Sequence, residues 1–339
     1  MIRIILILFF ALACQKVESS AVAKVSQAAK KIVVCSQNLA RLGSNKNEMQ
    51  EQLNYLVDRM LTANCSIVAL QEIAQDSPGA LGQLAQELSK RTGRKYEYLI
   101  GKSMDKYITN GYLVASDLGK VKSFKSYWNK SLPRLYPYGP SRGFLRGPAE
   151  LNIELYEPFR FSNKKNLNII NIHFKSKRDG WKDPAKMNFE VERVESAEAV
   201  RQIALNQSAK DTMLIVIGDR NNGKDTASDE VLEGRVELAD LSEGGACQLT
   251  KNEVALCRNT RNPALLGLFG LRLERYPDKF PKGSHKYRGK EHLLDEAFIR
   301  PQDLGLVTRN DKSLSIGYVG EYFKGSDHKL LFLELGNVD

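Results

Sequence analysis

The chain has 339 residues and carries 50 Lys and Arg against 40 Asp and Glu, which gives a formal net charge of +10. Hydrophobic residues make up 42% and charged residues 27%, a balance that excludes a largely disordered chain because it supplies ample material for a core. Only 25 residues are Gly, which excludes collagen, and no apolar stretch reaches about 20 residues, which excludes a polytopic membrane protein. The basic excess permits an anionic partner, such as nucleic acid or an acidic lipid surface.

Residues 1–13 (MIRIILILFFALA) have the features of a secretory signal peptide. Arg3 supplies a short positive region, an apolar run follows, and Ala11 and Ala13 satisfy the small-x-small rule for cleavage. Cys14 follows directly, so the segment resembles a bacterial lipoprotein signal in which this Cys is lipidated. Plain secretion and an uncleaved anchor are the alternatives. Residues 14–30 are small and polar, as a tether would be. We therefore expect export, either as a lipoprotein of the outer membrane or facing the periplasm, or as a secreted protein.

From residue 31 onward, strand-like and helix-like segments alternate without an internal repeat or a Pro/Gly/Ser linker. Short β-rich apolar runs predict strands, and apolar residues at helical spacing predict helices. The pattern indicates one domain over residues 31–339, with many strands and a few surface helices. The predicted strands are 31–36, 66–70, 96–100, 111–115, 121–127, 151–156, 167–172, 213–217, 293–299 and 329–335, and the predicted helices are 47–61, 81–88 and 184–208.

Four cysteines, Cys35, Cys65, Cys247 and Cys257, remain in the expected mature domain. Four cysteines allow three pairings, and the sequence does not choose among them. The short spacing in a loop-like stretch favours a bridge between Cys247 and Cys257, and buried free thiols are the alternative. No C-x-x-C motif occurs, so a structural zinc site is not expected.

Polar residues of metal-binding or acid–base type border six of the predicted strands. Most follow a strand directly, and the last two precede the final strand. Six such positions predict that the strand ends converge on one rim and form a site there. The chain has only four His, and two of them are in this set. The residues are Asn38, Glu72, His173, Asp219, Asn221, Asp295, Asp327 and His328.

The stretches around these residues resemble the endonuclease/exonuclease/phosphatase superfamily, the DNase I-like proteins. They occur in the family's order from residue 31 to the C-terminus, and the ordered set is far more specific than any single motif. Residues 286–298 (KYRGKEHLLDEAF) also resemble the family's Tyr-x-Gly approach to its Asp motif, and 141–144 (SRGF) resemble its basic segment before a central strand. The matching stretches are CSQNL, LQEI, NIHFKSK, GDRN, LDEAFI and SDH.

The resemblance implies an α/β fold, a four-layer α/β/β/α sandwich in which two packed, mostly antiparallel sheets are flanked by helices. It also implies metal-dependent hydrolysis of phosphoesters. Carried over to this chain, Glu72 binds Mg²⁺ with Asn38 and Asp327 nearby, and Mn²⁺ or Ca²⁺ are the alternative ions. His328 then faces the phosphorus, and Asp295 holds the orientation of its ring.

The resemblance assigns the remaining candidates to the attacking water and the phosphate. Asp219 is implied to position or deprotonate the water, although the family is divided between a His and an Asp base, and the sequence leaves that choice open. Asn221 and His173 are implied to donate hydrogen bonds to phosphate oxygens, where charge develops.

Three residues depart from the pattern or have no part in it. The family usually has Phe between the Asp and Asn of its GDFN motif, whereas this chain has Arg220. Because alternate side chains face opposite sides of a strand, Arg220 is expected to point away from Asp219 and Asn221. His285 and His292 match no motif and are expected at the surface.

Two basic stretches with aromatic residues favour a polyanionic substrate. Lys175 and Lys177 follow His173, and Tyr287 lies in the second stretch, before Asp295. Such residues could hold successive phosphates and stack on bases, whereas two solvated faces are the alternative. Together with Arg142, they are the candidate substrate-binding residues.

The leading hypothesis is an exported, Mg²⁺-dependent nuclease that acts on DNA or RNA as a monomer. The alternative enzyme is a lipid or inositol phosphodiesterase of the sphingomyelinase type, because residues 264–271 (ALLGLFGL) are unusually apolar and could touch a membrane. A lipid-anchored binding protein that has lost activity is a further alternative. A buried position under the long irregular loop region of residues 244–290 would also explain the apolar segment.

Overall fold

The computed structural model describes residues 30–77, 79–136, 142–161, 163–207, 209–223, 225–258, 269–270, 283–310, 313–322 and 325–336. The predicted signal peptide, Cys14 and nearly all of the tether lie outside the described residues, as does most of the apolar segment 264–271. Among the described residues, no helix combines the length and apolar character needed to span a bilayer.

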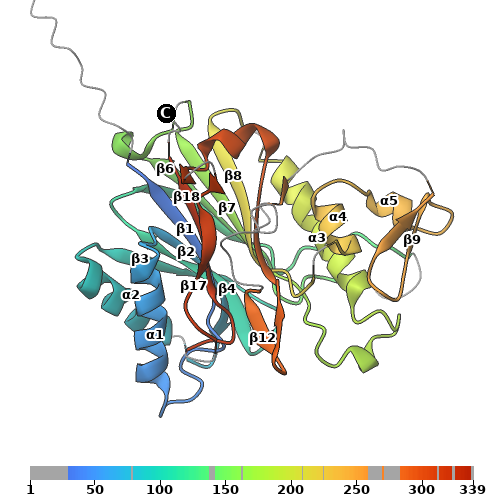
Figure 1. Ribbon diagram of the computed structural model, residues 1–339, viewed down its shortest axis with the longest axis horizontal. Coiled ribbons are helices and arrows are strands. Elements are labelled where there is room, and N and C mark those ends of the chain that lie inside the picture. Colours follow the sequence, from blue (N-terminus) through green and yellow to red (C-terminus); the bar gives the residue numbers. More distant parts are fainter. Residues whose placement is uncertain are drawn as a thin grey trace, which may run out of the picture.

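Two six-stranded sheets form the centre of the molecule (Figure 1). The β1–β2 and β7–β8 pairs are parallel, and the other pairs within the two sheets are antiparallel. The first sheet has the order β17 (Ile316–Val319), β18 (Leu330–Leu335), β1 (Ile32–Asn38), β2 (Ile67–Ala74), β4 (Ile108–Ala115) and β3 (Tyr96–Ile100); the second has the order β11 (Phe269–Gly270), β14 (Asp295–Ile299), β8 (Thr212–Asp219), β7 (Asn166–His173), β6 (Ala149–Leu155) and β5 (Gly119–Ser126).

Helices cover the outer faces of both sheets, so the chain forms the expected α/β/β/α sandwich (Figure 1). On the first sheet, α1 (Met49–Thr62) and α2 (Gly79–Thr92) bury an apolar stripe that includes Leu56 and Leu84. On the second, α3 (Glu190–Leu205) and α4 (Ala227–Leu232) pack on strands β7 and β8. The smaller elements are α5 (Leu238–Leu241), β9 (Cys247–Leu249), β10 (Ala255–Cys257), β12 (His285–Tyr287), β13 (Lys290–His292), β15 (Arg309–Asn310) and β16 (Ser313–Leu314).

The helix predicted from residue 184 begins six residues later, at Glu190. The Asp183 carboxylate accepts hydrogen bonds from the backbone N–H groups of Ala185, Met187 and Phe189, which folds this segment into a loop. Phe189 also has a positive φ of 63°, which is incompatible with a right-handed helix. Local side-chain hydrogen bonds therefore override the apolar periodicity that extended the prediction.

The four described cysteines form two disulfides. Cys247 pairs with Cys257, as the spacing favoured, and joins β9 to β10. Cys35 pairs with Cys65 and ties the middle of β1 to the turn before β2. Each bridge therefore links neighbouring segments, and the Cys35–Cys65 bridge anchors β1, the strand that ends in Asn38.

Candidate active site

The polar residues predicted to share one rim do so because of the strand directions. Strands β1, β2, β7 and β8 reach this rim with their carboxyl ends, and the antiparallel strands β14 and β18 begin there. In the second sheet, Asp219 at the end of β8 is paired with His173 on one side and with Asp295 on the other. The end of β8 is therefore the centre of the cluster.

The Asp219 carboxylate connects the side chains of both sheets. Its Oδ2 accepts a hydrogen bond from Asn38 Nδ2 at 3.2 Å and lies 3.6 Å from His173 Nε2 and 3.7 Å from His328 Nε2. Its Oδ1 accepts the backbone N–H of Asn221 at 2.7 Å. The side chains of Asp219, Asn38 and His328 are almost completely buried, so their interactions are weakly screened by solvent.

His328 and Asp295 form a buried pair next to Asp219. Asp295 Oδ2 lies 2.7 Å from His328 Nδ1, which fixes the ring and turns Nε2 toward Asp219. The backbone N–H of Asp295 donates to Ser284 Oγ at 2.9 Å, and Tyr318 Oη donates to the Asp295 carbonyl at 2.6 Å. These bonds hold the carboxylate that orients the imidazole.

The backbone of His328 is held from the first sheet. Arg59 of α1 donates from Nη1 to the His328 carbonyl at 2.8 Å, and Gln37 of β1 donates to the same oxygen at 3.4 Å. Ser326 Oγ accepts the His328 N–H at 3.0 Å. The imidazole is thus fixed at both its ring and its main chain, as a preorganised catalytic group requires.

The surroundings of His328 and Asp219 determine which of the two carries a proton. Burial disfavours a charged His328, but the carboxylates of Asp295 and Asp219 outweigh it and raise the pKa of His328 to about 10. Burial raises the pKa of Asp219 to about 6, although the nearby His328 cation opposes this change. At neutral pH the pair is therefore an imidazolium beside a carboxylate.

Glu72 is presented by an irregularity in β2. The register of β2 against β4 shifts between Leu70 and Ile73, and Glu72 has a positive φ of 55°. The neighbouring Gln71 donates to Asn171 Oδ1 at 2.7 Å, and Asn171 donates to the Leu70 carbonyl at 2.8 Å. These buried amides hold a bulge that would otherwise be costly, and bulges often redirect a side chain at an active site.

The Glu72 carboxylate fits a cation site. Its side chain is 27% exposed, and Oε1 lies 3.8 Å from His173 Nε2. Among the described residues, no hydrogen bond to this carboxylate is found, so its oxygens are free for a ligand from solution. A partly exposed carboxylate near that of Asp219, which lies 3.6 Å from the same His173 Nε2, suits a hard divalent cation that keeps several waters.

Arg146 is a site residue that the sequence reasoning missed. Its Nη1 lies 2.6 Å from His173 Nε2 and 3.2 Å from the Phe174 carbonyl, and its Nε pairs with Asp105 at 3.3 Å. Burial and the Arg146 charge hold the pKa of His173 well below its usual value, so the ring is neutral at physiological pH. Arg146 is thus a cationic donor beside His173, and the role of His173 as a donor to phosphate stays a prediction.

The substrate-binding candidates lie in different settings. Arg142 pairs with Glu195 of α3 at 3.6 Å, and Lys177 pairs with Glu253. Both side chains therefore contact neighbouring carboxylates and not the cluster around Asp219. Lys175 lies over the Phe189 ring at 4.3 Å, and Tyr287 is 56% exposed on β12. Arg146 precedes β6 by three residues, and this position in the basic segment is the signal that could have found it.

The surface prediction for His285 is wrong. His285 Nε2 lies 3.3 Å from Asp327 Oδ2, and its ring centroid lies 4.6 Å from that of His328. The hairpin of β12 and β13 docks against the start of β18 and brings the side chain there. His292, on the other strand of the hairpin, is exposed as expected.

Arg220 turns away from the catalytic cluster, as the strand alternation predicted. Its guanidinium is buried between Asp229 of α4 and Glu296 of β14, 2.9 Å from the latter. It also donates to the Leu293 carbonyl at 3.1 Å. An ionic cluster therefore replaces the apolar packing of the family's Phe behind the site.

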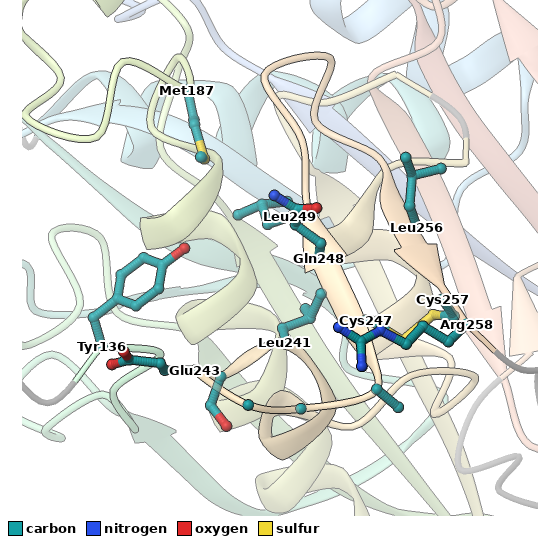
Figure 2. A pocket seen from close by; sticks show the side chains of 14 residues that line it. Tyr136, Met187, Leu241, Glu243, Cys247, Gln248, Leu249, Leu256, Cys257 and Arg258 are labelled. Atoms are coloured by element: carbon teal, nitrogen blue, oxygen red, sulfur yellow. A yellow bond between two sulfur atoms is a disulfide. The ribbon is translucent and has the colours of Figure 1, made fainter.

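A hollow of about 800 Å³ lies away from these residues, beside the Cys247–Cys257 disulfide (Figure 2). Tyr136, Met187 and segments 241–249 and 256–258 line it. None of the candidate catalytic or metal-binding residues contributes to its wall. The chemistry is therefore located by the convergent carboxylates and imidazoles and not by the size of this hollow.

Comparisons with solved structures give the same fold at low sequence identity. The matches include an endonuclease/exonuclease/phosphatase family protein from Bacteroides thetaiotaomicron, with a TM-score of 0.52, 13% identity and coverage of 91% of this chain and 98% of that one. The chain has the fold of the endonuclease/exonuclease/phosphatase superfamily. TDP2 from D. rerio, complexed with a single-strand DNA product, matches with a TM-score of 0.52 and 14% identity over 91% of this chain and 100% of that one.

ANGEL2, a 2',3'-cyclic phosphatase, is similar over 90% of this chain and 95% of its own, with a TM-score of 0.55 and 12% identity. No family model matches the sequence. No curated protein matches it either. At these identities the similarity establishes the DNase I-like fold, and the activity has to be argued from the site itself.

Proposed function

We propose that the protein is a divalent-metal-dependent phosphodiesterase whose substrate is nucleic acid. The observation that carries this proposal is the buried contact between Asp219, ionised at neutral pH, and His328, held as a cation by Asp295. A proton acceptor next to a fixed positive charge suits water attack on a phosphodiester, where negative charge builds on the phosphate oxygens.

Glu72, Asn38 and Asp327 would hold the cation, which we propose to be Mg²⁺, with Mn²⁺ or Ca²⁺ as alternatives. The bound ion supplies charge stabilisation for the phosphate oxygens. Two features support this assignment. The three side chains offer oxygen ligands, and among the described residues no hydrogen bond to Glu72 is found. Proton transfer and further charge stabilisation are assigned to Asp219, His328 and Arg146.

Asp219 is the proposed proton acceptor. As the water oxygen bonds to phosphorus, its proton passes to Asp219 Oδ2, and the bond from phosphorus to the leaving oxygen breaks. The His328 imidazolium stabilises the developing charge through Nε2–H, and Arg146 adds a second cationic donor. With a pKa of about 10, His328 is a poor base at neutral pH, which favours Asp219 for that role.

Exposed aromatic side chains near basic residues favour nucleic acid over a small phosphoester. Tyr287 is exposed next to Arg288, and Trp181 is 81% exposed beside Lys182. Such pairs can stack on bases and attract the phosphate backbone. TDP2 in its complex with single-strand DNA has the same fold, which is consistent with this substrate class. Export and a lipid anchor at Cys14 remain predictions from residues 1–30.

The proposal is tested by nicking of supercoiled plasmid in Mg²⁺. Glu72→Gln removes the charge of the proposed cation ligand at nearly constant shape and is expected to lower the nicking rate about 10²-fold. Glu97→Gln is the matched control, because Glu97 is exposed on the edge strand β3, and it should change the rate less than twofold. An intact plasmid after incubation with folded wild-type protein, or equal rates for the two variants, would contradict the proposal.

The pH dependence distinguishes the two bases. Asp219 must be ionised to accept a proton, and its pKa of about 6 already includes the opposing effect of the His328 cation. A bound divalent cation would lower this pKa further. Activity should therefore fall only below about pH 6, and the loss of the His328 charge should lower it again near pH 10. A rate that rises through pH 7 with the titration of an ordinary imidazole would instead show a His base.

A further inference from the structure

The β12–β13 hairpin places a second imidazole next to the catalytic one. His285 forms an isolated β-bridge with His328, the Lys286 N–H donates to the Asp327 carbonyl at 3.3 Å, and the Lys329 N–H donates to the Ser284 carbonyl at 2.7 Å. Backbone bonds on both sides of His328 therefore fix the hairpin against the start of β18. The position of His285 follows from main-chain pairing and not from a flexible loop.

Three side chains converge at this point with metal-ligand spacing. One ligand atom from each of His285, Asp327 and His328 lies within 4.8 Å of the others. The 3.3 Å between His285 Nε2 and Asp327 Oδ2 is close to the ~3.4 Å that separates two ligands of a tetrahedral ion with bonds of about 2.0–2.1 Å. Only modest side-chain movement is needed to bring three donors to one ion.

The surroundings also suit an ion with nitrogen ligands. His328 Nδ1 is engaged by Asp295 Oδ2 at 2.7 Å, which leaves Nε2 for the ion and reproduces the carboxylate–histidine–metal arrangement. The Asp327 side chain is 45% exposed, so an ion can enter from solvent and keep a water as its fourth ligand. The His285 side chain is only 13% exposed and is fixed in place.

We propose that His285, Asp327 and His328 form a Zn²⁺ site that shares Asp327 with the proposed Mg²⁺ site of Glu72, Asn38 and Asp327. Two imidazoles and one carboxylate favour Zn²⁺ over Mg²⁺, which prefers oxygen ligands and water. Occupation of this site replaces the Nε2 proton of the His328 imidazolium with the ion and engages the Asp327 carboxylate. Zn²⁺ therefore inhibits the phosphodiesterase reaction in which both residues are proposed to act.

Binding is tested without substrate, so that the result does not depend on the proposed activity. Zn²⁺ is titrated calorimetrically into the purified full-length protein in excess Mg²⁺, with His285→Gln as the variant. Gln retains a hydrogen-bond donor to Asp327 but lacks the imidazole ligand. His292→Gln on the same hairpin is the matched control, since His292 is exposed and outside the cluster.

Wild type and His292→Gln should each bind one Zn²⁺ with equal affinity, and His285→Gln should bind it at least about tenfold more weakly. Co²⁺ gives a second readout in the wild-type protein, because a tetrahedral site with nitrogen ligands produces an intense visible absorption that Zn²⁺ displaces. No saturable Zn²⁺ binding by the wild type, or equal affinity in His285→Gln, would overturn the site. A failure of nuclease activity alone would leave both binding readouts unchanged and would count only against the proposed function.

Discussion

Replacing His328 with alanine is expected to lower kcat about 10³-fold while the protein stays folded. The imidazole is fixed by Asp295 at 2.7 Å and by hydrogen bonds to its backbone, and its charge lies 3.7 Å from the proposed proton acceptor. Alanine removes the cation that faces the developing negative charge. The measurement is single-turnover cleavage of a defined oligonucleotide at saturating enzyme, which reports the chemical step rather than binding.

Two further variants separate a catalytic role from general damage to the site. His292→Ala removes an exposed imidazole from the neighbouring hairpin and should retain the wild-type rate within twofold. Asp295→Asn should lower kcat on its own, but adding it to His328→Ala should cost almost nothing more, because Asp295 acts through the ring. Independent, multiplicative losses would show that the two residues do not work as one unit.

Replacing Arg220 with methionine is expected to lower the free energy of unfolding by about 3–5 kcal/mol. Arg220 is buried, and its guanidinium contacts the carboxylates of Asp229 and Glu296, which are also buried. These two carboxylates raise the pKa of the guanidinium above its ordinary value even though burial opposes its charge. Methionine fills much of the same volume but leaves both carboxylates without this cation. Urea unfolding followed by far-UV circular dichroism measures the change.

The matched control for Arg220 is another Arg–Asp pair, exposed on the helical surface. Arg91 pairs with Asp58 at 2.6 Å, and the two side chains are 35% and 56% exposed. Exposed pairs contribute about 0–1 kcal/mol, so Arg91→Met should change stability by no more than that amount. If Arg220→Met were no more destabilising than Arg91→Met, the buried cluster would not be what holds β8, α4 and β14 together.

The sequence predicts the rim of the site well because strand ends and residue chemistry are both visible in it. Asp219 and His173 each end an apolar run, and parallel pairing of β7 with β8 brings them together. Apolar runs also locate Glu72, although the bulge that presents it depends on Asn171, 100 residues from Gln71. The fold class followed from the ordered motifs and not from any single element.

The errors come from interactions between distant segments and from local side-chain bonds. His285 has no motif of its own and reaches the site only because the hairpin pairs with the start of β18. Arg146 acquires its role from Asp105 and His173, on two other segments of the chain. The predicted start of α3 was wrong because the Asp183 carboxylate accepts hydrogen bonds from three backbone N–H groups. The spacing of apolar residues does not reveal these bonds.

The metal dependence of phosphodiester hydrolysis itself is the most direct test of the proposed function. Release of 4-nitrophenolate from bis(4-nitrophenyl) phosphate isolates the chemistry at phosphorus from the recognition of a polymer. We expect turnover with Mg²⁺ or Mn²⁺, loss of turnover on chelation, and full recovery when the ion is restored. Turnover that persists in chelator, or no turnover by folded protein with any of these ions, would contradict a metal-dependent phosphodiesterase at the Asp219–His328 site.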